Sequence, residues 1–208
     1  MSEREQYARQ AAEWSERAYA DARAYLDHRA ELIVRVGPRL EPGDEVLDLA
    51  CGDAGLAEPV LERGLRYRGV DSTPEMAAVA RGRLGDRAPV DVADLNDYVP
   101  PDEVAATTLF RAIYYARDRR AFFRHVAGFT GKKLVFDLNP RQYRLGDVLN
   151  DLQAAGLGRV ALRPFFVPQT VALPGPAVAL ARTLERSGPL ARLTLRFRFT
   201  YLVAASRD

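Results

Sequence analysis

Two hydrophobic periods alternate along the chain from about residue 41 onward. Short apolar runs, typical of buried strands, are separated by stretches in which apolar residues recur at helical spacing. The runs predict strands at 45–49, 67–70, 90–92, 104–110, 133–138, 159–166 and 193–204. The stretches between them predict helices at 56–63, 74–84, 118–129, 144–155 and 176–186. Alternation of this kind with short connections predicts a parallel sheet with helices on both faces.

The first forty residues follow a different pattern. Aromatic and aliphatic residues lie among glutamate and arginine at roughly helical spacing, namely Tyr7, Ala11, Trp14, Ala18, Tyr25, Leu32 and Leu40. They predict one or two amphipathic helices over residues 3 to 36, ended by Pro38 and the turn at 41–44. We therefore expect a single domain over 1–208, with a helical N-terminal cap or lid (1–40) on an α/β core (41–208).

Composition narrows the class of protein. The 208 residues carry a formal net charge of only +2, which gives no electrostatic case for nucleic acid or for an anionic membrane. One cysteine, Cys51, excludes an internal disulfide framework and a cysteine-based zinc site. The polar start of the chain is unlike a signal peptide, and no apolar run approaches a membrane span. We expect a cytoplasmic protein without a nucleic-acid partner or stable membrane association, and the oligomeric state is left open.

The turn after the first predicted strand carries candidate chemistry. Residues 46–57 read VLDLACGDAGLA, an apolar run followed by an acid, small residues and a second apolar segment. Strand, tight turn and helix in this order are typical of nucleotide-binding α/β domains, in which backbone approaches the ligand closely. Ala50 stands where the dinucleotide-binding fingerprint has its first glycine, and two carboxylates, Asp48 and Asp53, lie beside the turn.

A further acid follows the second predicted strand. In an open α/β sheet the ligand binds beyond the carboxyl ends of the strands. Asp71 stands 19 positions after Gly52, near the spacing of roughly 20 at which an acid receives the ribose hydroxyls. A carboxylate there accepts two hydrogen bonds from a vicinal diol, so the pairing of turn and acid favours a ligand that contains adenosine.

The acidity of the turn discriminates between adenosine cofactors. A pyrophosphate would face Asp53 and Asp48, and like charges in a partly desolvated site are costly unless they are neutralised. S-adenosylmethionine carries a sulfonium and an ammonium and no phosphate, so the same carboxylates favour it. Alanine in place of the first glycine fits a ligand of this kind, because without a pyrophosphate the backbone does not have to approach the ligand so closely. The turn therefore predicts S-adenosylmethionine and disfavours an NAD-dependent oxidoreductase.

Three segments resemble, in order and spacing, the motifs of the class I S-adenosylmethionine-dependent methyltransferases. VLDLACGDAG (46–55) is similar to the first motif, YRGVDSTPEM (67–76) to the second and VADL (92–95) to the third. Asp53 departs from the family, which usually has Thr or Ser there. The resemblance covers roughly residues 40–140, and we expect one Rossmann-like, doubly wound sheet of about seven strands whose last strand is antiparallel.

The resemblance implies a set of cofactor-binding residues: Tyr7, Trp14, Arg29, Asp48, Ala50, Gly52, Gly55, Asp71, Ser72, Met76, Asp94, Leu95 and Phe110. Asp48 would lie near the methionine amino group and Arg29 near the methionine carboxylate. Gly52 and Gly55 would let the backbone pass close to the cofactor, while Ala50 would offer its carbonyl to the ammonium.

At the adenosine end, the same resemblance places Asp71 at the ribose diol, with Ser72 and Met76 near the adenine. Asp94 would accept a hydrogen bond from the adenine amino group, and Leu95 would pack on the ring. No metal site is expected.

The acceptor side is predicted at the exit of the fourth strand. Arg111, Tyr114 and Tyr115 follow that strand, where substrates of this family approach the methyl group. We expect one tyrosine to pack inward and the other to face the pocket. The apolar segment 165–174 either walls the substrate site or covers the sheet edge, and the aromatic residues of 1–25 either close the pocket or pack in the core.

Three further side chains have two interpretations each. Cys51 fits a small buried residue better than a nucleophile, because no histidine lies near it in the sequence. His28 and His125 lie in helical stretches near arginines, which favours solvated positions on helix surfaces over catalysis.

The function expected from these patterns is methyl transfer to a small, partly apolar metabolite, with an O- or N-acceptor undetermined. An N-P-P-Y-type motif and the metal-ligand pattern of catechol-type enzymes are both missing, which disfavours amide or base N-methylation and metal-assisted O-methylation. The alternatives are a methyltransferase acting on RNA or protein, and a non-enzymatic S-adenosylmethionine-binding protein.

Overall fold

A seven-stranded sheet runs through the part of the chain that the structure, a computed structural model, describes: residues 21–166, 174–186 and 200–207. The strand order is β3-β2-β1-β4-β5-β7-β6. The strands are β1 (Glu45–Leu49), β2 (Arg66–Asp71), β3 (Val90–Val92), β4 (Val104–Leu109), β5 (Thr130–Leu138), β6 (Arg159–Pro164) and β7 (Tyr201–Ser206). β7 pairs antiparallel with both β5 and β6, whereas the pairs among β1 to β5 are parallel. The predicted Rossmann-like, doubly wound sheet with an antiparallel last strand is confirmed.

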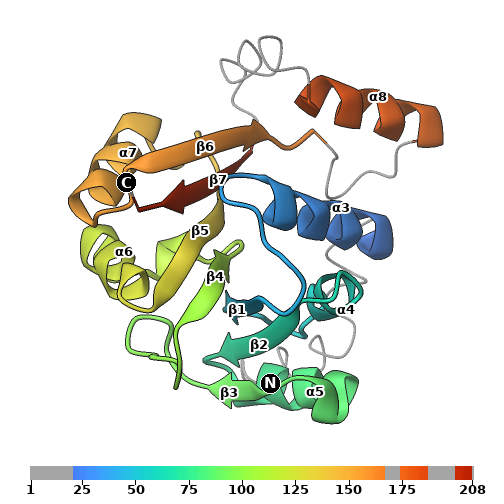
Figure 1. Cartoon of the computed structure of the whole chain (residues 1–208), viewed down its shortest axis with the longest axis vertical. Coiled ribbons are helices and arrows are strands. Elements are labelled where there is room, and N and C mark those ends of the chain that lie inside the picture. The colour runs from blue at the N-terminus through green and yellow to red at the C-terminus, as the bar shows by residue number, and fades with distance from the viewer. Residues whose placement is uncertain (1–20, 167–173, 187–199, 208) are drawn as a thin grey trace, which may run out of the picture.

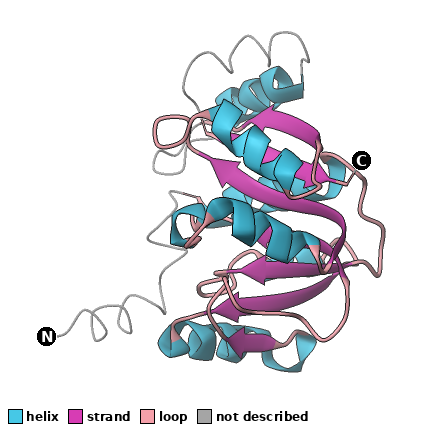
Figure 2. Cartoon of the chain, turned by 90° about the vertical axis from the view of Figure 1, so that its left-hand side faces the viewer, coloured by secondary structure: helices cyan, strands magenta, loops and turns pink. Residues whose placement is uncertain are grey.

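Helices cover both faces of this sheet (Figure 1). The helices are α3 (Ala22–Arg35), α4 (Ala57–Leu61), α5 (Pro74–Leu84), α6 (Arg119–Ala127), α7 (Leu145–Ala154) and α8 (Gly175–Arg186), with 3₁₀ turns η1 (Gly85–Arg87) and η2 (Ile113–Tyr115). One hydrophobic core joins the sheet to α3, α4 and α5, and a second joins it to α6 and α7. Figure 2, seen from the side of α6 and α7, shows the twisted sheet behind them.

Successive residues of the central strands supply the two cores in turn. In β1, Val46 packs in the core under α3 to α5 and Leu47 in the core under α6 and α7; in β5, Val135 and Phe136 do the same. Because side chains alternate across a strand, a strand that is buried on both faces is apolar at most positions. This is why the sequence shows short apolar runs. Asp48 in β1 and Lys133 in β5 are buried exceptions.

Most predicted elements are confirmed with shifts of a few residues at their ends. α5 and β3 have the predicted bounds, and β6 stops at Pro164, two residues early. The last strand begins at Tyr201 and ends at Ser206, whereas the sequence pattern suggested 193–204; residues 193–199 lie outside the described ranges. Residues 1–20, with Tyr7 and Trp14, also lie outside them. Within the described residues, no helix is long and apolar enough to cross a membrane.

The prediction of a solvated histidine is wrong for His28. Its imidazole is fully buried, and Nε2 lies 2.6 Å from Oε2 of Glu185 in α8. The other oxygen of Glu185 accepts a hydrogen bond from the backbone N–H of Phe166 at 2.7 Å. Phe165 itself is buried, with its ring centroid 5.2 Å from that of His28. Because His28 and Glu185 are 157 positions apart, the local sequence pattern could not predict this pair.

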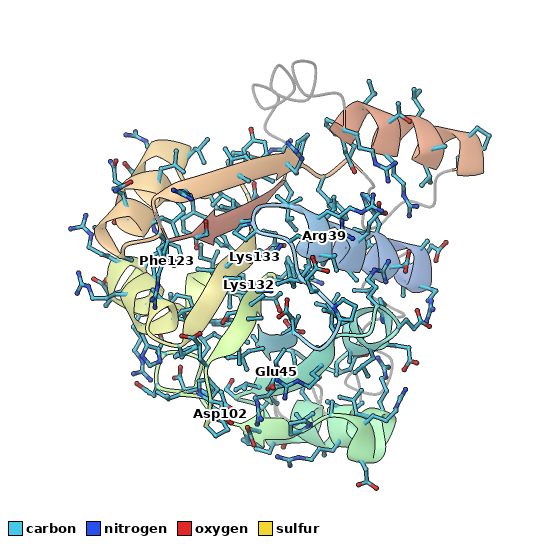
Figure 3. The ribbon with its side chains drawn as sticks, in the orientation of Figure 1. Arg39, Glu45, Asp102, Phe123, Lys132 and Lys133 are labelled. Carbon is cyan, nitrogen blue, oxygen red and sulfur yellow. The ribbon has the colours of Figure 1, made fainter. Side chains whose placement is uncertain are left out.

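Lys133 in β5 is a charged residue in the core (Figure 3). Its Nζ donates hydrogen bonds to the carbonyl oxygens of Val34, at 3.2 Å, and Val36, at 2.7 Å, at the end of α3. Burial, with a smaller contribution from neighbouring Lys132, lowers the pKa of Lys133 to about 7. A cation at a helix C-terminus is favourable, but the buried ammonium loses hydration, so burial sets the direction.

We expect this lysine to make the protein more stable as the pH rises from 7 toward 10. Between a folded-state pKa of about 7 and an unfolded-state value near 10.5, the unfolded chain binds more protons, so the free energy of unfolding increases with pH. The slope approaches ~1.4 kcal/mol per pH unit. Urea unfolding of wild type and Lys133→Met between pH 7 and 9.5 should show this slope only in wild type. Lys132→Met, the control, should retain it; equal slopes in all three proteins would refute the assignment.

Candidate functional site

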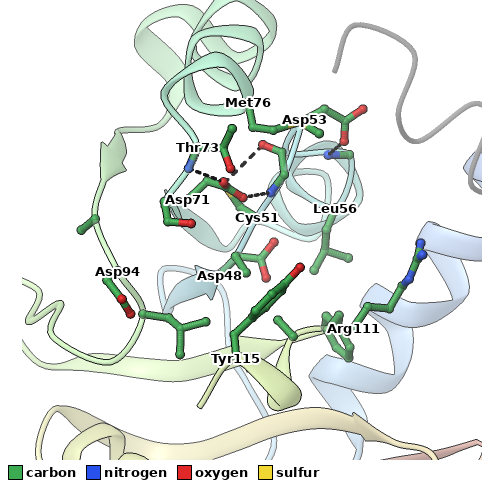
Figure 4. Close-up of a pocket in the computed structure, with 18 of the residues that line it drawn as sticks. Asp48, Cys51, Asp53, Leu56, Asp71, Thr73, Met76, Asp94, Arg111 and Tyr115 are labelled. Atoms are coloured by element: carbon green, nitrogen blue, oxygen red, sulfur yellow. Dashed lines mark hydrogen bonds between the residues drawn. The ribbon is translucent and has the colours of Figure 1, made fainter. Parts of the chain in front are cut away.

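A cavity of about 400 Å³ opens beyond the carboxyl ends of β1, β2 and β4 (Figure 4). Its walls come from the turn after β1, the segments after β2, β3 and β4, and one face of α3. Every described residue of the predicted site lines it: Arg29, Asp48, Ala50, Gly52, Gly55, Asp71, Ser72, Met76, Asp94, Leu95, Phe110, Arg111, Tyr114 and Tyr115. The fold therefore brings together the residues that the ends of the predicted strands indicated.

The turn after β1 keeps a glycine-like backbone. Ala50 has φ 60° and Ala54 φ 55°, on either side of Gly52 at φ 58°. The left-handed conformation costs an alanine roughly 1–2 kcal/mol, so the surrounding structure must hold it. One such tie is the backbone N–H of Cys51, which donates to the carbonyl of Val70 at 2.9 Å. Ala50 thus takes the place of the first glycine without changing the direction of the turn.

Gly69 in β2 makes room for this turn. A Cβ at Gly69 would lie 2.9 Å from the sulfur of Cys51, closer than real contacts allow. Burial raises the pKa of the Cys51 thiol well above its usual range, and the charges of Asp48 and Asp71 add to the shift. A thiol of this kind stays protonated at neutral pH, which fits the structural interpretation of Cys51 rather than a nucleophile.

Asp71, at the end of β2, ties two loops of the cavity together. Its Oδ2 accepts a hydrogen bond from the backbone N–H of Gly52 at 2.8 Å, and its Oδ1 accepts one from Thr73 at 2.9 Å. A carboxylate has roughly four acceptor sites, so each oxygen retains a lone pair for a further donor. The carboxylate is buried against the cavity and suited to accept hydrogen bonds from a vicinal diol.

Asp48 places a buried carboxylate at the centre of the site. Oδ2 accepts from the Tyr67 hydroxyl at 2.9 Å and Oδ1 from the Thr108 hydroxyl at 2.6 Å. Burial raises the pKa of Asp48 to about 6, and the two hydroxyls and the charge of Arg29 limit the rise. A buried carboxylate of this kind is stabilised by a cation, so it fits an ammonium group in the cavity.

The prediction that the charge of Asp53 faces the ligand is wrong. Its carboxylate is turned toward α5, where Oδ2 lies 3.1 Å from Nη2 of Arg83, and Oδ1 accepts from the backbone N–H of Gly55 at 3.2 Å. The ion pair neutralises the charge that the sequence assigned to the turn. The acidity that a ligand meets therefore comes from Asp48 and Asp71. The ion pair with Arg83 thus holds the aspartate within the turn.

Asp94, after β3, accepts several hydrogen bonds. Oδ1 accepts from the backbone N–H of Asn96 at 2.8 Å and from its Nδ2 at 2.7 Å, while Oδ2 lies 2.6 Å from Nη2 of Arg117. These interactions, the backbone bond first, lower the pKa of Asp94. The side chain is therefore a fixed, charged acceptor at one end of the cavity.

Arg29 reaches the cavity from α3 although it is almost completely buried. Its guanidinium carbon lies 4.1 Å from the ring centroid of Phe110, and Nη2 donates to the Tyr25 hydroxyl at 2.9 Å. Nη2 also lies 3.7 Å from Oδ2 of Asp137 at the end of β5. Stacking and pairing of this kind hold a buried cation in place, so α3 contributes a fixed positive charge to the wall.

The acceptor end is formed by the segment after β4. Arg111 has φ 54° and donates its backbone N–H to Oδ1 of Asp137 at 2.7 Å. Tyr114 and Tyr115 are 55% and 57% exposed, with ring centroids 4.4 Å apart. The expectation that one tyrosine packs inward is wrong: Ile113 fills the core and both rings lie at the rim. Figure 4 shows Tyr115 pointing into the cavity.

Sequence reasoning missed several wall residues: Leu26, Leu56, Thr73, Asn96 and Arg117. Thr73 and Asn96 each follow a predicted acid by two positions and donate a backbone N–H to it, a local signal that could have found them. Arg117 reaches the cavity through ion pairs with Asp94 and Asp97, which no spacing rule indicates. His125 is half-buried, with Nε2 2.8 Å from the carbonyl oxygen of Tyr98.

Fold and cavity together are typical of α/β proteins that bind a ligand at the carboxyl edge of the sheet. Residues 46–132 match a family model described as a methyltransferase domain. An uncharacterized methyltransferase of Schizosaccharomyces pombe is 33% identical over 90 residues, which are 43% of this chain and 30% of that protein. The resemblance of the three motifs to the class I S-adenosylmethionine-dependent methyltransferases is thereby confirmed over residues 46–132.

Solved structures share the fold over nearly the whole chain. A methyltransferase in complex with the Haloferax volcanii Trm112 activator has a TM-score of 0.69 and 20% identity, over 98% of this chain and 95% of that one. Magnesium protoporphyrin IX methyltransferase of Synechocystis, solved with S-adenosylmethionine, has a TM-score of 0.58 and 15% identity, over 90% and 82%. At these identities the likeness is one of fold.

Proposed function

We propose that this chain transfers a methyl group from S-adenosylmethionine to a small, partly apolar molecule bound beside Tyr114 and Tyr115. The observation that carries the proposal is the placement of Asp48 and Asp71 on one wall of the cavity, with aromatic side chains at the other end. A volume of about 400 Å³ lies in the range of small-molecule sites. A cytoplasmic location and the division into an N-terminal cap and a core belong to the same proposal.

The residues present fit this cofactor rather than a dinucleotide. Asp71 keeps acceptor capacity for the ribose diol, and Asp48 offers its buried negative charge to the ammonium. A pyrophosphate near the turn would meet Asp48 without a neutralising partner of equal strength, since Arg29 only limits the rise of its pKa. Asp94 supplies an acceptor for an exocyclic amine, and Leu95 an apolar surface for the ring.

Methyl transfer requires little acid–base catalysis by the protein. S-adenosylmethionine supplies a methyl group that is already activated by its sulfonium, so the chain mainly aligns the acceptor and excludes water. Burial and a hydrogen bond with Tyr115 raise the pKa of Tyr114 to about 12. Tyr114 therefore stays protonated at neutral pH and serves as a hydrogen-bond donor to the acceptor rather than as a general base.

Cofactor binding gives the test of this proposal. S-adenosylhomocysteine at a hundredfold excess over its Kd should stabilise the protein by about 2.7 kcal/mol by mass action. For a chain of this length that is a rise in Tm of roughly 5–10 °C. NAD at the same concentration should leave the Tm unchanged. Stabilisation by NAD without stabilisation by S-adenosylhomocysteine would contradict the proposal.

The alternative substrates are distinguished by turnover. A screen with labelled S-adenosylmethionine against small metabolites, RNA and protein separates a small-molecule enzyme from a macromolecule-modifying one. Cofactor binding without methylation of any class of acceptor would instead support a non-enzymatic binder.

We expect removal of residues 1–20 to lower turnover at least tenfold while the sheet still folds. In the proposal the N-terminal segment closes the pocket, and closure of a site excludes water and commits the substrate. The described residues of α3 already pack in one core with the sheet, so we expect the Tm of the truncated chain to fall by only a few degrees. Methylation at the full-length rate by the truncated chain would refute the closing role.

A further inference from the structure

Four side chains connect the two ends of the cavity through a single network. Asp94, Asn96 and Asp97 lie after β3, and Arg117 lies just beyond η2, the turn that carries Tyr114 and Tyr115. Nη2 of Arg117 is 2.6 Å from Asp94 and 3.0 Å from Asp97, and Nη1 is 3.2 Å from the other oxygen of Asp97. We call Asp94, Asn96, Asp97 and Arg117 the clasp.

Asn96 is the central residue of the clasp. Its Nδ2 donates to the backbone carbonyl of Tyr115 at 3.1 Å and to Oδ1 of Asp94 at 2.7 Å. Its Oδ1 accepts from the backbone N–H of Arg117 at 3.0 Å. One amide group thus holds the backbone on both sides of residue 116 and, at the same time, the carboxylate at the opposite end of the site.

The segment that carries the tyrosines depends on such a support. Both rings are more than half exposed, and the turn is anchored in the core through Ile113 and closed by a backbone hydrogen bond from Tyr115 to Ala112 at 2.9 Å. Isolated ion pairs on a surface contribute little, but a half-buried amide with three hydrogen bonds restrains the backbone directly. The backbone at Tyr115 and Arg117 is therefore restrained from outside η2.

We propose that Asn96 and Arg117 are positioning residues, through which a ligand bound at Asp94 fixes Tyr114 and Tyr115 at the acceptor end. The inference rests on the proposed function, because that function places the exocyclic amine of the cofactor at Asp94. A donor at Asp94 joins the carboxylate that Asn96 and Arg117 already share. The acceptor end thereby becomes ordered when the cofactor end is filled, and the two substrates are coupled without direct contact.

Hydrogen exchange of the backbone over residues 111–118 tests the inference. In wild type, S-adenosylhomocysteine should slow exchange in this segment. Without ligand, Asn96→Ala should exchange there at least tenfold faster than wild type, because three hydrogen bonds of the amide group are lost. Arg117→Ala should exchange roughly threefold faster, because the ion pairs that it loses are exposed and contribute less. In Asn96→Ala the ligand should no longer slow the segment.

Arg87→Ala is the matched control, since Arg87 makes an exposed ion pair with Glu58 at 2.7 Å away from the cavity. It should exchange as wild type does in residues 111–118. Arg117→Lys should recover part of the protection, because the charge beside Asp94 and Asp97 is kept. If Asn96 and Arg117 had a purely structural role, exchange would be faster in Asn96→Ala and Arg117→Ala but S-adenosylhomocysteine would still slow it. That result would overturn the coupling.

The outcomes separate this inference from the proposed function. If S-adenosylhomocysteine fails to bind wild type, the proposed function is contradicted, and unliganded exchange still decides whether the clasp holds the tyrosine segment. If the ligand binds while Asn96→Ala and Arg117→Ala keep the exchange of wild type, the clasp is overturned and the proposed function stands. Arg117 is exposed, so its variant folds even if Asn96→Ala does not.

Discussion

Asp71→Ala is expected to weaken S-adenosylhomocysteine binding by roughly 2–4 kcal/mol, or about 30- to 1,000-fold in Kd. The carboxylate would accept both hydroxyls of the ribose, and alanine leaves a buried diol without partners. Two backbone donors, the N–H groups of Gly52 and Thr73, also lose their acceptor. The affinity loss therefore combines a direct contact with loosening of the two loops. Isothermal calorimetry measures the change.

Two further variants define the role of Asp71. Asp71→Asn keeps one acceptor oxygen and should fall between wild type and Asp71→Ala. Asp86→Ala, an exposed aspartate in η1 outside the cavity wall, should bind as wild type does. The fold should survive in Asp71→Ala with a loss of about 1–2 kcal/mol, because two backbone hydrogen bonds are lost and the hydrophobic cores are untouched. Wild-type affinity in a folded Asp71→Ala would remove this residue from the site.

Asp48→Asn should weaken the same ligand by about 1.5–3 kcal/mol at pH 7.5, the usual contribution of a hydrogen bond to a charged group. The effect should depend on pH. With a pKa of about 6, Asp48 in wild type becomes protonated as the pH falls from 7.5 to 5, so affinity for the ammonium group should fall over that range. In Asp48→Asn the affinity should be low and nearly constant with pH.

Stability without ligand should move in the opposite direction. Because the folded-state pKa of Asp48 lies above its unfolded value of 3.8, the folded protein binds more protons between pH 4 and 6, and this group favours folding as the pH falls. Removing the buried charge in Asp48→Asn should therefore stabilise the protein at pH 7 by about 1–3 kcal/mol. Asp118→Asn, at the N-cap of α6, is the control and should change neither property. Wild-type affinity in a folded Asp48→Asn would contradict a cation-binding role.

The sequence alone was enough to predict the order of strands and helices along the chain and most of the described cavity wall. Strands buried on both faces are apolar at most positions, and that pattern is local, as at 134–136 in β5. The turn at 46–55 could be predicted because its conformation is set by its own backbone. Asp71 could be predicted because it follows Gly52 at a spacing of 19 positions, one strand later along the chain.

How the charged side chains pair depends on contacts between distant parts of the chain. Asp53 turns to Arg83 in α5, and His28 binds Glu185 across 157 positions, so both acquired roles that the sequence had assigned differently. Likewise, Asn96 and Arg117 join the wall because β3 and β4 end at the same edge of the sheet. Partners of long polar side chains are chosen by proximity in space and by the cost of leaving a buried charge unpaired, and neither quantity is encoded in the periodicity of the chain.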